Sequence, residues 1–325
     1  MAWLRIVVGY DGSDDAINED IARILSVRSE LEEPELWWRV SSDEVRAWFV
    51  SEDPEKARSF AILFEGSKLV GLAWSFRGRE GCYASIDVDA SRGMEVASLY
   101  AKNLLAWARA RAEELGCRSV LSVNAGLEFG YRYLVISRAL GDAPRVIEWS
   151  GTLMKFVNPA SVLRVVVEGF RVREGSLADS EAIARVFNRA FSRYPWFTPW
   201  GRSDVERHLK LESTRTFVIE DSRGNVVGFS MIVLRTSIKG KRVGYLDVIA
   251  VDPSYQGRGL GKFLVQRSVE ELKRVGVDEI VLDSVRGVEG LYQKLGFTYV
   301  RRYLRFVVPL RAIPAINVGI SRWRA

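Results

Sequence analysis

Histidine and cysteine are scarce in this sequence of 325 residues, which has one histidine and two cysteines. Two cysteines, Cys82 and Cys117, are too few for a disulfide framework, and their spacing does not match that of a metal site. We therefore expect two buried or inert thiols and no metal centre. The single histidine, His208, lies far along the chain from the motifs described below, so we expect it to be a solvated residue on a helix.

Long apolar runs are also missing. No run is long enough to span a membrane, and the first residues lack the basic and apolar regions of a secretory leader. We therefore expect a soluble, cytoplasmic protein without a membrane partner. The net charge of +6 is modest and the basic residues are dispersed, which argues against a nucleic-acid partner. A chain of this length, with 48% apolar residues, predicts two domains.

The second half of the chain repeats the pattern of the first. Hydrophobic periodicity in the first half predicts a helix over 14–30, strands at 59–64, 69–76 and 83–88, a helix over 94–115 and a strand at 118–123. In the second half it predicts an edge strand at 170–174, a helix over 179–191, strands at 217–220, 226–234 and 245–251, a helix over 260–274 and a strand at 279–283. Two copies of one α/β unit are the simplest explanation.

In the second copy, a strand turns into a helix through Pro253-Ser254-Tyr255-Gln256-Gly257-Arg258-Gly259-Leu260-Gly261. Glycines at alternate positions allow the backbone to approach an anion, and the first turn of a helix supplies free N–H groups and partial positive charge. The turn therefore predicts a site for a phosphate-bearing cofactor. A P-loop would need Ser or Thr in place of Phe263, and a dinucleotide fingerprint would need Gly or Ala in place of Lys262.

The corresponding segment of the first copy, Ser91 to Glu95, has a single glycine. It also places the acidic Glu95 near the start of the helix, where a bound anion would lie. We therefore expect the first copy to be degenerate, and either to be structural or to form a wall of the acceptor site.

Two motifs of the second copy resemble those of the GNAT acetyltransferase superfamily. Gln256-x-x-Gly259-x-Gly261 resembles the acetyl-CoA signature of that superfamily, and Gly290-Leu291-Tyr292-Gln293-Lys294-Leu295-Gly296-Phe297 resembles its closing motif. The resemblance implies an α/β (α+β) fold with two tandem GNAT-like units, each with a mixed, mostly antiparallel central sheet flanked by helices. We expect the degenerate unit at 1–158, the acetyltransferase unit at 168–310 and a C-terminal tail at 311–325.

The resemblance also implies which residues bind acetyl-CoA, the expected cosubstrate. The backbone of Ile249, Ala250 and Val251 would pair with the pantetheine arm like an added strand, and a backbone N–H near Val251 would stabilise the oxygen of the reacting thioester. The pyrophosphate would be held by the turn that consists of Gln256, Gly257, Arg258, Gly259, Leu260, Gly261 and Lys262.

Acyl transfer to an amine also needs a general acid and a base. Tyr292 occupies the position of the general acid in the superfamily. Three possibilities stay open for the base: Asp283, Asp247, and a water relay without a dedicated side chain. Both aspartates lie on predicted strands, where partial burial would raise the pKa of a carboxyl group toward that of a useful base.

These residues predict an N-acetyltransferase that transfers an acetyl group from acetyl-CoA, by direct attack, to a primary amine of a small molecule or a peptide N-terminus. The alternative is a non-catalytic module that binds or senses acyl-CoA, because Val285 stands where many relatives have an asparagine. A nucleic-acid-modifying enzyme would need a continuous basic face. The aromatic segment 193–200 either borders the acceptor site or packs against the first copy, and the sequence leaves the oligomeric state open.

Overall fold

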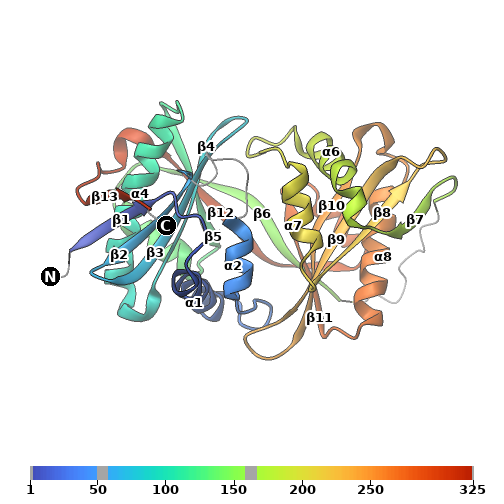
Figure 1. The fold of residues 1–325 in the computed structure, drawn as a ribbon, viewed down its shortest axis with the longest axis horizontal. Helices are drawn as coiled ribbons and strands as arrows, with labels where there is room; N and C mark the ends of the chain where they lie inside the picture. Colours follow the sequence, from blue (N-terminus) through green and yellow to red (C-terminus); the bar gives the residue numbers. More distant parts are fainter. Residues whose placement is uncertain (1–2, 50–57, 158–166, 324–325) are drawn as a thin grey trace. The chain divides into compact units, whose positions relative to one another are not determined.

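A computed structural model describes residues 3–49, 58–157 and 167–323 of the chain. The chain forms two compact units, one of residues 1–150 together with 303–325 and the other of residues 151–302. Each unit consists of a mixed, mostly antiparallel sheet with helices packed on it (Figure 1). The predicted fold class, two tandem α/β units with this kind of sheet, is confirmed.

The boundaries of the units differ from the predicted 1–158, 168–310 and 311–325, because the two halves exchange their last strands. Strand β6 (Val146–Phe156) begins in the first unit, but its residues 151–155 pair with β11 of the second. Strand β12 (Phe297–Pro309) begins in the second unit, and its residues 303–309 pair with β5 of the first. The sequence cannot show this exchange, since the last strand of either half could pair with the sheet of its own unit or with the sheet of the other unit.

The expected C-terminal tail at 311–325 is also corrected by the structure. It contains a 3-10 turn, η4 (Leu310–Ala312), and a strand, β13 (Gly319–Arg322). This strand pairs in parallel with β1 (Leu4–Val8), which the periodicity had not predicted. Residues 319–322 are therefore part of the first unit's sheet.

The first unit has the strand order β13-β1-β2-β3-β4-β5-β12. Its other strands are β2 (Phe60–Glu65), β3 (Lys68–Gly78), β4 (Gly81–Val88) and β5 (Val120–Leu127). Its helical elements are α1 (Asp15–Glu32), α2 (Ser42–Phe49), η1 (Ala90–Arg92), α4 (Gly93–Glu114) and α5 (Tyr131–Leu140). Asp14 caps α1, because its carboxylate accepts from the N–H of Ile17 at 3.1 Å.

Cys82 and Cys117 form a disulfide, with the sulfur atoms 2.10 Å apart, so the expectation of two inert thiols was wrong. Cys82 lies in β4, and Cys117 follows the end of α4. The chain turns back after α4 through Gly116, where φ is +82°, and this brings the two Cα atoms to 6.2 Å. Their separation of 35 residues in the sequence gives no sign of this proximity.

The second unit has the strand order β6-β11-β10-β9-β8-β7. Its strands besides β6 are β7 (Arg171–Glu174), β8 (Thr214–Glu220), β9 (Val226–Thr236), β10 (Arg242–Val251) and β11 (Glu279–Val285). Its helical elements are η2 (Leu177–Asp179), α6 (Ser180–Phe191), α7 (Arg202–Leu209), η3 (Pro253–Tyr255), α8 (Leu260–Arg274) and α9 (Glu289–Gln293).

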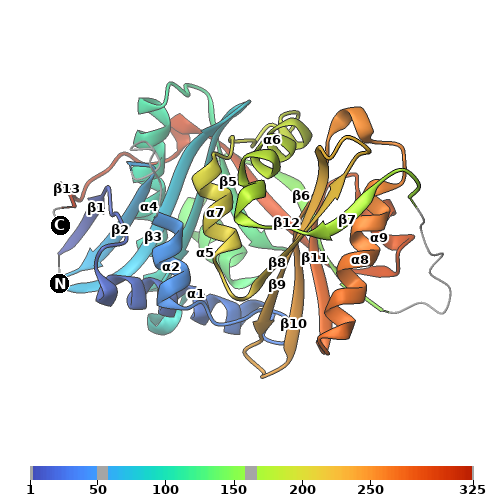
Figure 2. The same cartoon turned by 45° about the vertical axis from the view of Figure 1, so that its right-hand side comes forward.

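The second unit has an apolar core on each face of its sheet. Helices α6 and α7 pack on one face, through Phe187 and Val205 against Phe229 and Ala250. Helix α8 packs on the other face, where Leu264 lies among Val227 and Val251. Figure 2 shows α6 and α7 on one side of β8–β10 and α8 on the opposite side. The two cores fix the ends of β10 and β11, at which the predicted site residues lie.

Candidate active site

Strands β10 and β11 run side by side for only part of their length. Their parallel register extends from Val243 opposite Glu279 to Leu246 opposite Leu282, whereas β10 continues to Val251. On its other side, β10 stays paired with β9 as far as Val251. The backbone of Ile249, Ala250 and Val251 therefore lies beyond the last residue pair with β11. An unmatched strand edge of this kind can hydrogen-bond the amides of an extended ligand.

A β-bulge causes the two strands to separate. Leu246 pairs with Ile232 of β9 and Val248 with Met231, so Asp247 is an extra residue on β10. A bulge increases the local twist and bends the strand that carries it. It turns β10 away from β11 directly after their last pair, and it leaves Asp247 at the point where the opening begins.

The glycine turn lies at the end of β10 and starts helix α8. Gly257 and Gly259 have φ of +81° and +84°, so the backbone conformation itself requires glycine there. The side-chain amide of Gln256 donates to the carbonyl oxygen of Val251 at 2.9 Å and ties the turn back to the strand. Lys262 is exposed in the first turn of the helix.

Neither the backbone conformation nor the neighbouring atoms require glycine at position 261. Its φ is not positive, and a Cβ atom built on it would meet no atom of the described residues within 4 Å. Neither strain nor packing therefore explains a glycine in the first turn of α8, where alanine would stabilise the helix. The open space above Gly261 suits a ligand phosphate that approaches the N–H groups of this turn, so the residues present fit the pyrophosphate of acetyl-CoA.

The two candidate bases lie at the same point of the opening, each directly after the last residue pair of β10 and β11. The side chain of Asp283 is held, because the phenol of Tyr245 donates to its Oδ2 atom at 2.9 Å. Burial and the charges of Asp283 and Asp247 raise the pKa of Tyr245 well above its usual value, so this phenol stays a hydrogen-bond donor. We had not predicted Tyr245 as a site residue. It lies two residues before Asp247, hence on the same face of the strand, and that alternation could have identified it.

Asp247 faces α7, and its environment shows that the expectation for His208 was wrong. Burial raises the pKa of Asp247, and the charges of His208 and Arg235 partly oppose that shift. His208 is half-buried rather than solvated, and its ring stacks on Trp200 with the centroids 5.2 Å apart. Burial lowers the pKa of His208, although Asp247 pulls it upward. Sequence distance hid this pairing, since α7 and β10 meet only in the folded unit.

Tyr292, the predicted general acid, lies on α9 and packs in the same apolar cluster as Leu246 and Ile249 of β10. Its ring meets Phe297 edge-on at 6.0 Å. Burial, with a further contribution from the phenol of Tyr194, raises the pKa of Tyr292 to about 12. Tyr292 is also close enough to Tyr245 to raise its pKa. The structure thus brings Tyr292, Asp247 and Asp283 together around Tyr245.

The first unit opens at the corresponding place, between β4 and β5, but an ion pair crosses the opening. The parallel register of these strands ends at Ala84 opposite Val123. Beyond it, the guanidinium of Arg132 on α5 donates to both carboxylate oxygens of Asp87 on β4, at 2.6 and 2.7 Å. Both side chains are about nine-tenths buried. Arg28 of α1 adds a further contact to Asp87 at 3.0 Å.

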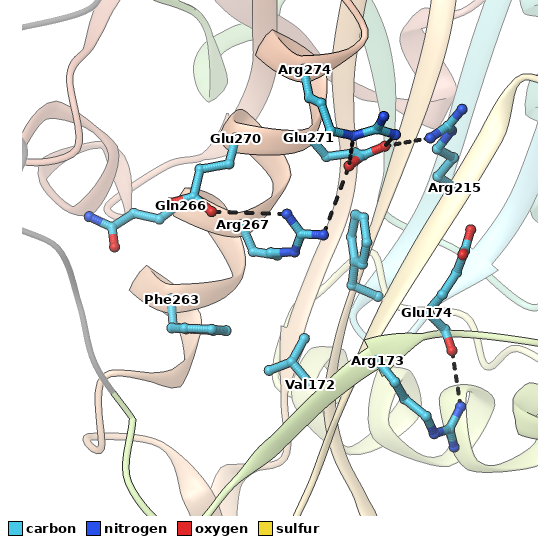
Figure 3. Close-up of a pocket in the computed structure, with 11 residues that line it drawn as sticks. Val172, Arg173, Glu174, Arg215, Phe263, Gln266, Arg267, Glu270, Glu271 and Arg274 are labelled. Atoms are coloured by element: carbon cyan, nitrogen blue, oxygen red, sulfur yellow. Dashed lines mark hydrogen bonds and ion pairs between the residues drawn. The ribbon is translucent and has the colours of Figure 1, made fainter.

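A separate cavity of about 670 Å³ lies in the second unit between α8 and the edge strands (Figure 3). Its walls hold Phe217, four arginines and three glutamates, and the ion pairs of Figure 3 join these groups to one another. None of the residues that line this cavity belongs to the strand opening or the glycine turn. Among the described residues, no helix combines the length and hydropathy needed to cross a membrane, and no three or more His, Cys, Asp or Glu side chains group to hold a metal ion.

The fold is that of a tandem GNAT protein. A solved structure of a tandem GNAT protein from the clavulanic acid biosynthesis pathway matches 94% of this chain and 98% of its own, with a TM-score of 0.60 and 14% identity. Residues 181–297 match the model of the acetyltransferase (GNAT) family. The chain therefore carries a GNAT acetyltransferase domain in its second unit, and the resemblance drawn from the two motifs is confirmed.

Curated relatives named for acetyl transfer match less than half of the chain. Mycothiol acetyltransferase of Saccharomonospora viridis is 30% identical over 139 residues, which are 39% of this chain and 45% of the relative. Glucosamine 6-phosphate N-acetyltransferase of Trypanosoma brucei brucei is 34% identical over 84 residues, which are 25% of this chain and 57% of the relative. The chain thus spans about half the length of these relatives.

Proposed function

We propose that this protein is an acetyl-CoA-dependent N-acetyltransferase whose second unit acetylates a primary amine. The observation that carries this proposal is the opening between β10 and β11, which has a free strand edge on one side, a glycine turn at its end and Tyr292 beside it. The relatives are named for acetyl transfer to small molecules, which supports a small-molecule acceptor more than a peptide N-terminus.

The pantetheine arm and the pyrophosphate of acetyl-CoA would each have a matching group in the second unit. The edge of Ile249 to Val251 would pair with the amides of the pantetheine arm, and the N–H groups from Gly257 to Lys262 would hold the pyrophosphate. Bound acetyl-CoA would supply, as a thioester, the acetyl group that the amine attacks directly. A backbone N–H near Val251 would donate to the carbonyl oxygen on which negative charge develops.

We assign the role of base to Asp247. Its carboxyl group has a raised pKa and makes no hydrogen bond to another described residue, whereas Asp283 is held by Tyr245. A carboxylate with a raised pKa accepts a proton from an ammonium group, directly or through water, more readily than an ordinary carboxylate does. The phenol of Tyr292, protonated throughout the neutral pH range, would give its proton to the leaving sulfur.

The first unit serves as a structural unit in this proposal. The ion pair of Arg132 and Asp87 crosses the opening that would have to admit the pantetheine arm. Near the start of α4, Glu95 stands in the first turn, with Arg138 as its partner at 2.9 Å. We therefore propose that one molecule of acetyl-CoA binds to each chain.

The test is to measure CoA release from acetyl-CoA over a panel of small amines and peptides, for the wild type and for Tyr292→Phe. We expect turnover with at least one amine, and a loss of kcat of about 100-fold or more in the variant. A sensor of acyl-CoA would bind acetyl-CoA without turnover on the whole panel. Calorimetry supplies the stoichiometry, and two molecules bound per chain would contradict the role given to the first unit.

A further inference from the structure

A continuous run of aromatic rings joins the two ends of the candidate active site. This aromatic run consists of Phe187, Phe191, Tyr194, Trp196 and Trp200. Consecutive centroid distances along it are 3.8 Å for Trp200 with Phe187, 4.7 Å for Phe187 with Phe191, 5.7 Å for Phe191 with Tyr194, and 5.2 Å for Tyr194 with Trp196. These rings come from α6 and the segment that follows it.

Each end of the aromatic run meets one of the groups proposed for the chemistry. Trp200 stacks on His208, the imidazole that faces Asp247. Tyr194 lies close enough to Tyr292 for the two phenols to interact. The run also packs on β10 directly after the proposed base, because Phe187, Phe191 and Trp200 share an apolar cluster with Val248 and Ala250. It therefore borders the opening at which we propose that the acceptor amine binds.

Hydrogen bonds hold the aromatic run in place. The side-chain amide of Asn188 brackets the backbone of Trp200, because its Nδ2 donates to the Trp200 carbonyl at 2.9 Å and its Oδ1 accepts from the Trp200 N–H at 2.8 Å. The N–H of Tyr194 donates to the carbonyl of Phe191 at 2.9 Å, which fixes the turn after α6. Tyr194 and Trp196 stay only half-buried, so part of each ring remains accessible to a ligand.

The charges around the run favour a cation. Asp247 and Asp283 supply two carboxyl groups at the opening. Three arginines border the same region, and each has a partner: Arg193 lies over the ring of Tyr194 at 5.2 Å, Arg207 pairs with Asp204 at 2.6 Å, and Arg235 donates to the Oγ of Ser213 at 2.7 Å. A ligand phosphate would have to compete with these partners and would be repelled by the carboxylates. An ammonium group would be attracted both by the carboxylates and by the faces of the rings.

We infer that the acceptor is a primary amine on a flat apolar or aromatic body without phosphate groups, held with its body on the aromatic run and its nitrogen toward Asp247 and Asp283. This inference rests on the proposed acetyltransferase function. It distinguishes this site from one built for a phosphorylated amino sugar, which needs free cations for the phosphate.

The first experiment compares kcat/KM for phenethylamine, ethanolamine, glucosamine 6-phosphate and triglycine, with saturating acetyl-CoA. Phenethylamine should exceed each of the others by about tenfold or more, since stacking and cation–π contacts account for that range. If glucosamine 6-phosphate or triglycine equals or exceeds phenethylamine, the inference about the acceptor fails, while the acetyltransferase function stands.

The second experiment locates the contact. Trp196→Ala should raise KM for phenethylamine about 5- to 20-fold with little change in kcat, and Trp196→Phe should restore most of the affinity. Tyr299→Ala is the matched control, because Tyr299 is a half-exposed aromatic residue of the same unit that lies outside the aromatic run. An unchanged KM in Trp196→Ala, with an unaltered melting temperature, would overturn the assignment.

A binding measurement separates the two levels of the proposal. Saturation-transfer NMR of phenethylamine should show contact with the wild type and a weakened signal with Trp196→Ala, whether or not turnover occurs. Binding without turnover on the whole panel would refute the acetyltransferase function and leave the amine site in place. Absence of binding would refute the inference about the acceptor itself.

Discussion

The hydroxyl of Tyr245 donates a hydrogen bond to Oδ2 of Asp283 at 2.9 Å. This contact separates two carboxylates that the sequence alone could not distinguish. One carboxylate oxygen of Asp283 accepts from the phenol of Tyr245, which stays protonated. Asp247 lies in a β-bulge and interacts with the imidazole of His208. Position along the two strands is the same for both, so only their contacts decide which of them acts as the base.

The first prediction follows from this difference. Asp247→Asn should lower kcat/KM by about 100-fold or more, because it removes the group that takes the proton from the amine. Asp283→Asn should cost about tenfold or less, as should Tyr245→Phe, since both disturb only the support of the site. Steady-state kinetics with a single amine provides the comparison. A larger loss in Asp283→Asn than in Asp247→Asn would reverse the assignment.

Substitutions of two glycines in the turn should affect stability and acetyl-CoA binding differently. Gly261→Ala should leave the protein as stable as the wild type, or more stable by about 0.5–1 kcal/mol, because alanine is the better helix residue and meets open space. The same change should raise the Kd for acetyl-CoA about tenfold or more, since the methyl group occupies the path of the phosphates. Gly259→Ala should instead cost about 1–2 kcal/mol of stability, because φ is +84° there.

Thermal melts and calorimetry with acetyl-CoA test this pair. Gly319→Ala, at an open glycine with ordinary φ in the first unit, controls for the substitution itself. If Gly261→Ala binds acetyl-CoA as tightly as the control does, the pyrophosphate does not lie over this turn.

Activity should decline on the acid side at a higher pH than that of an ordinary carboxyl group. Asp247 acts as a base only when deprotonated, and burial raises its pKa, so kcat/KM should fall as the pH falls through that raised value. The positive charge of protonated His208 opposes the shift, so His208→Gln should move the acid limb to still higher pH.

A pH profile of kcat/KM between about pH 4 and 10 measures both effects. Tyr292 should add no alkaline limb in this range, because its pKa of about 12 keeps it protonated. Asp204, Arg207 and Arg235 are the other charged neighbours of His208 and Asp247, and they stay unchanged in the His208 variant. A shift of the acid limb in this variant therefore reports the effect of the imidazole. An acid limb that His208→Gln leaves in place would show that the imidazole does not influence the base.

The ion pair in the first unit should be important for stability. Asp87→Asn should destabilise the protein by about 3–5 kcal/mol, because it leaves Arg132 buried without its charged partner. The double variant Asp87→Leu with Arg132→Met should recover much of that loss. Burial would raise the pKa of Asp87, but Arg132 and Arg28 outweigh it and hold the pKa below its usual value.

Because the pKa of Asp87 is lower in the folded protein than in the unfolded chain, the stability that the ion pair adds depends on pH. The stabilisation is present above the pKa of an unfolded aspartate and is lost as the pH falls through the lower folded value. Urea unfolding at several pH values, for the wild type and both variants, gives the magnitude and the sign. A single variant as stable as the double one would show that the pair is not buried as described.

The disulfide should stabilise the first unit. Its loop of 35 residues corresponds to about 4 kcal/mol of chain entropy in the unfolded state. Cys82→Ser with Cys117→Ser, or reduction with dithiothreitol, should therefore lower the melting temperature, and reductant should have no further effect on the double variant. Equal melting temperatures with and without reductant in the wild type would refute the contribution.

The four longest of the described helices and most of the paired strands were predictable because their periodicity is local. Helix α8 was predicted with the bounds it has, since its apolar face and the glycines at both ends are visible in the sequence. Strand β1, strand β13, helix α5 and the exchanged strands β6 and β12 were missed. Their positions depend on partners far along the chain, which no local pattern can reveal.

The candidate site shows the same division. The strand edge, the turn from Gln256 to Lys262 and Tyr292 are consecutive or nearly so in the chain, and they were named from motifs. Tyr245 and His208 were not assigned to the chemistry, because their importance comes from what they contact. Three rings of the aromatic run, Tyr194, Trp196 and Trp200, belong to the segment 193–200, which the sequence placed either at the acceptor site or against the first copy. The sequence by itself therefore determined the fold class and the proposed cofactor-binding turn, since local backbone requirements encode both. Only the tertiary structure decided which of the two proposed bases is held by a hydrogen bond, which strand closes each sheet and which rings stack into one run, because each of these depends on contacts between distant segments.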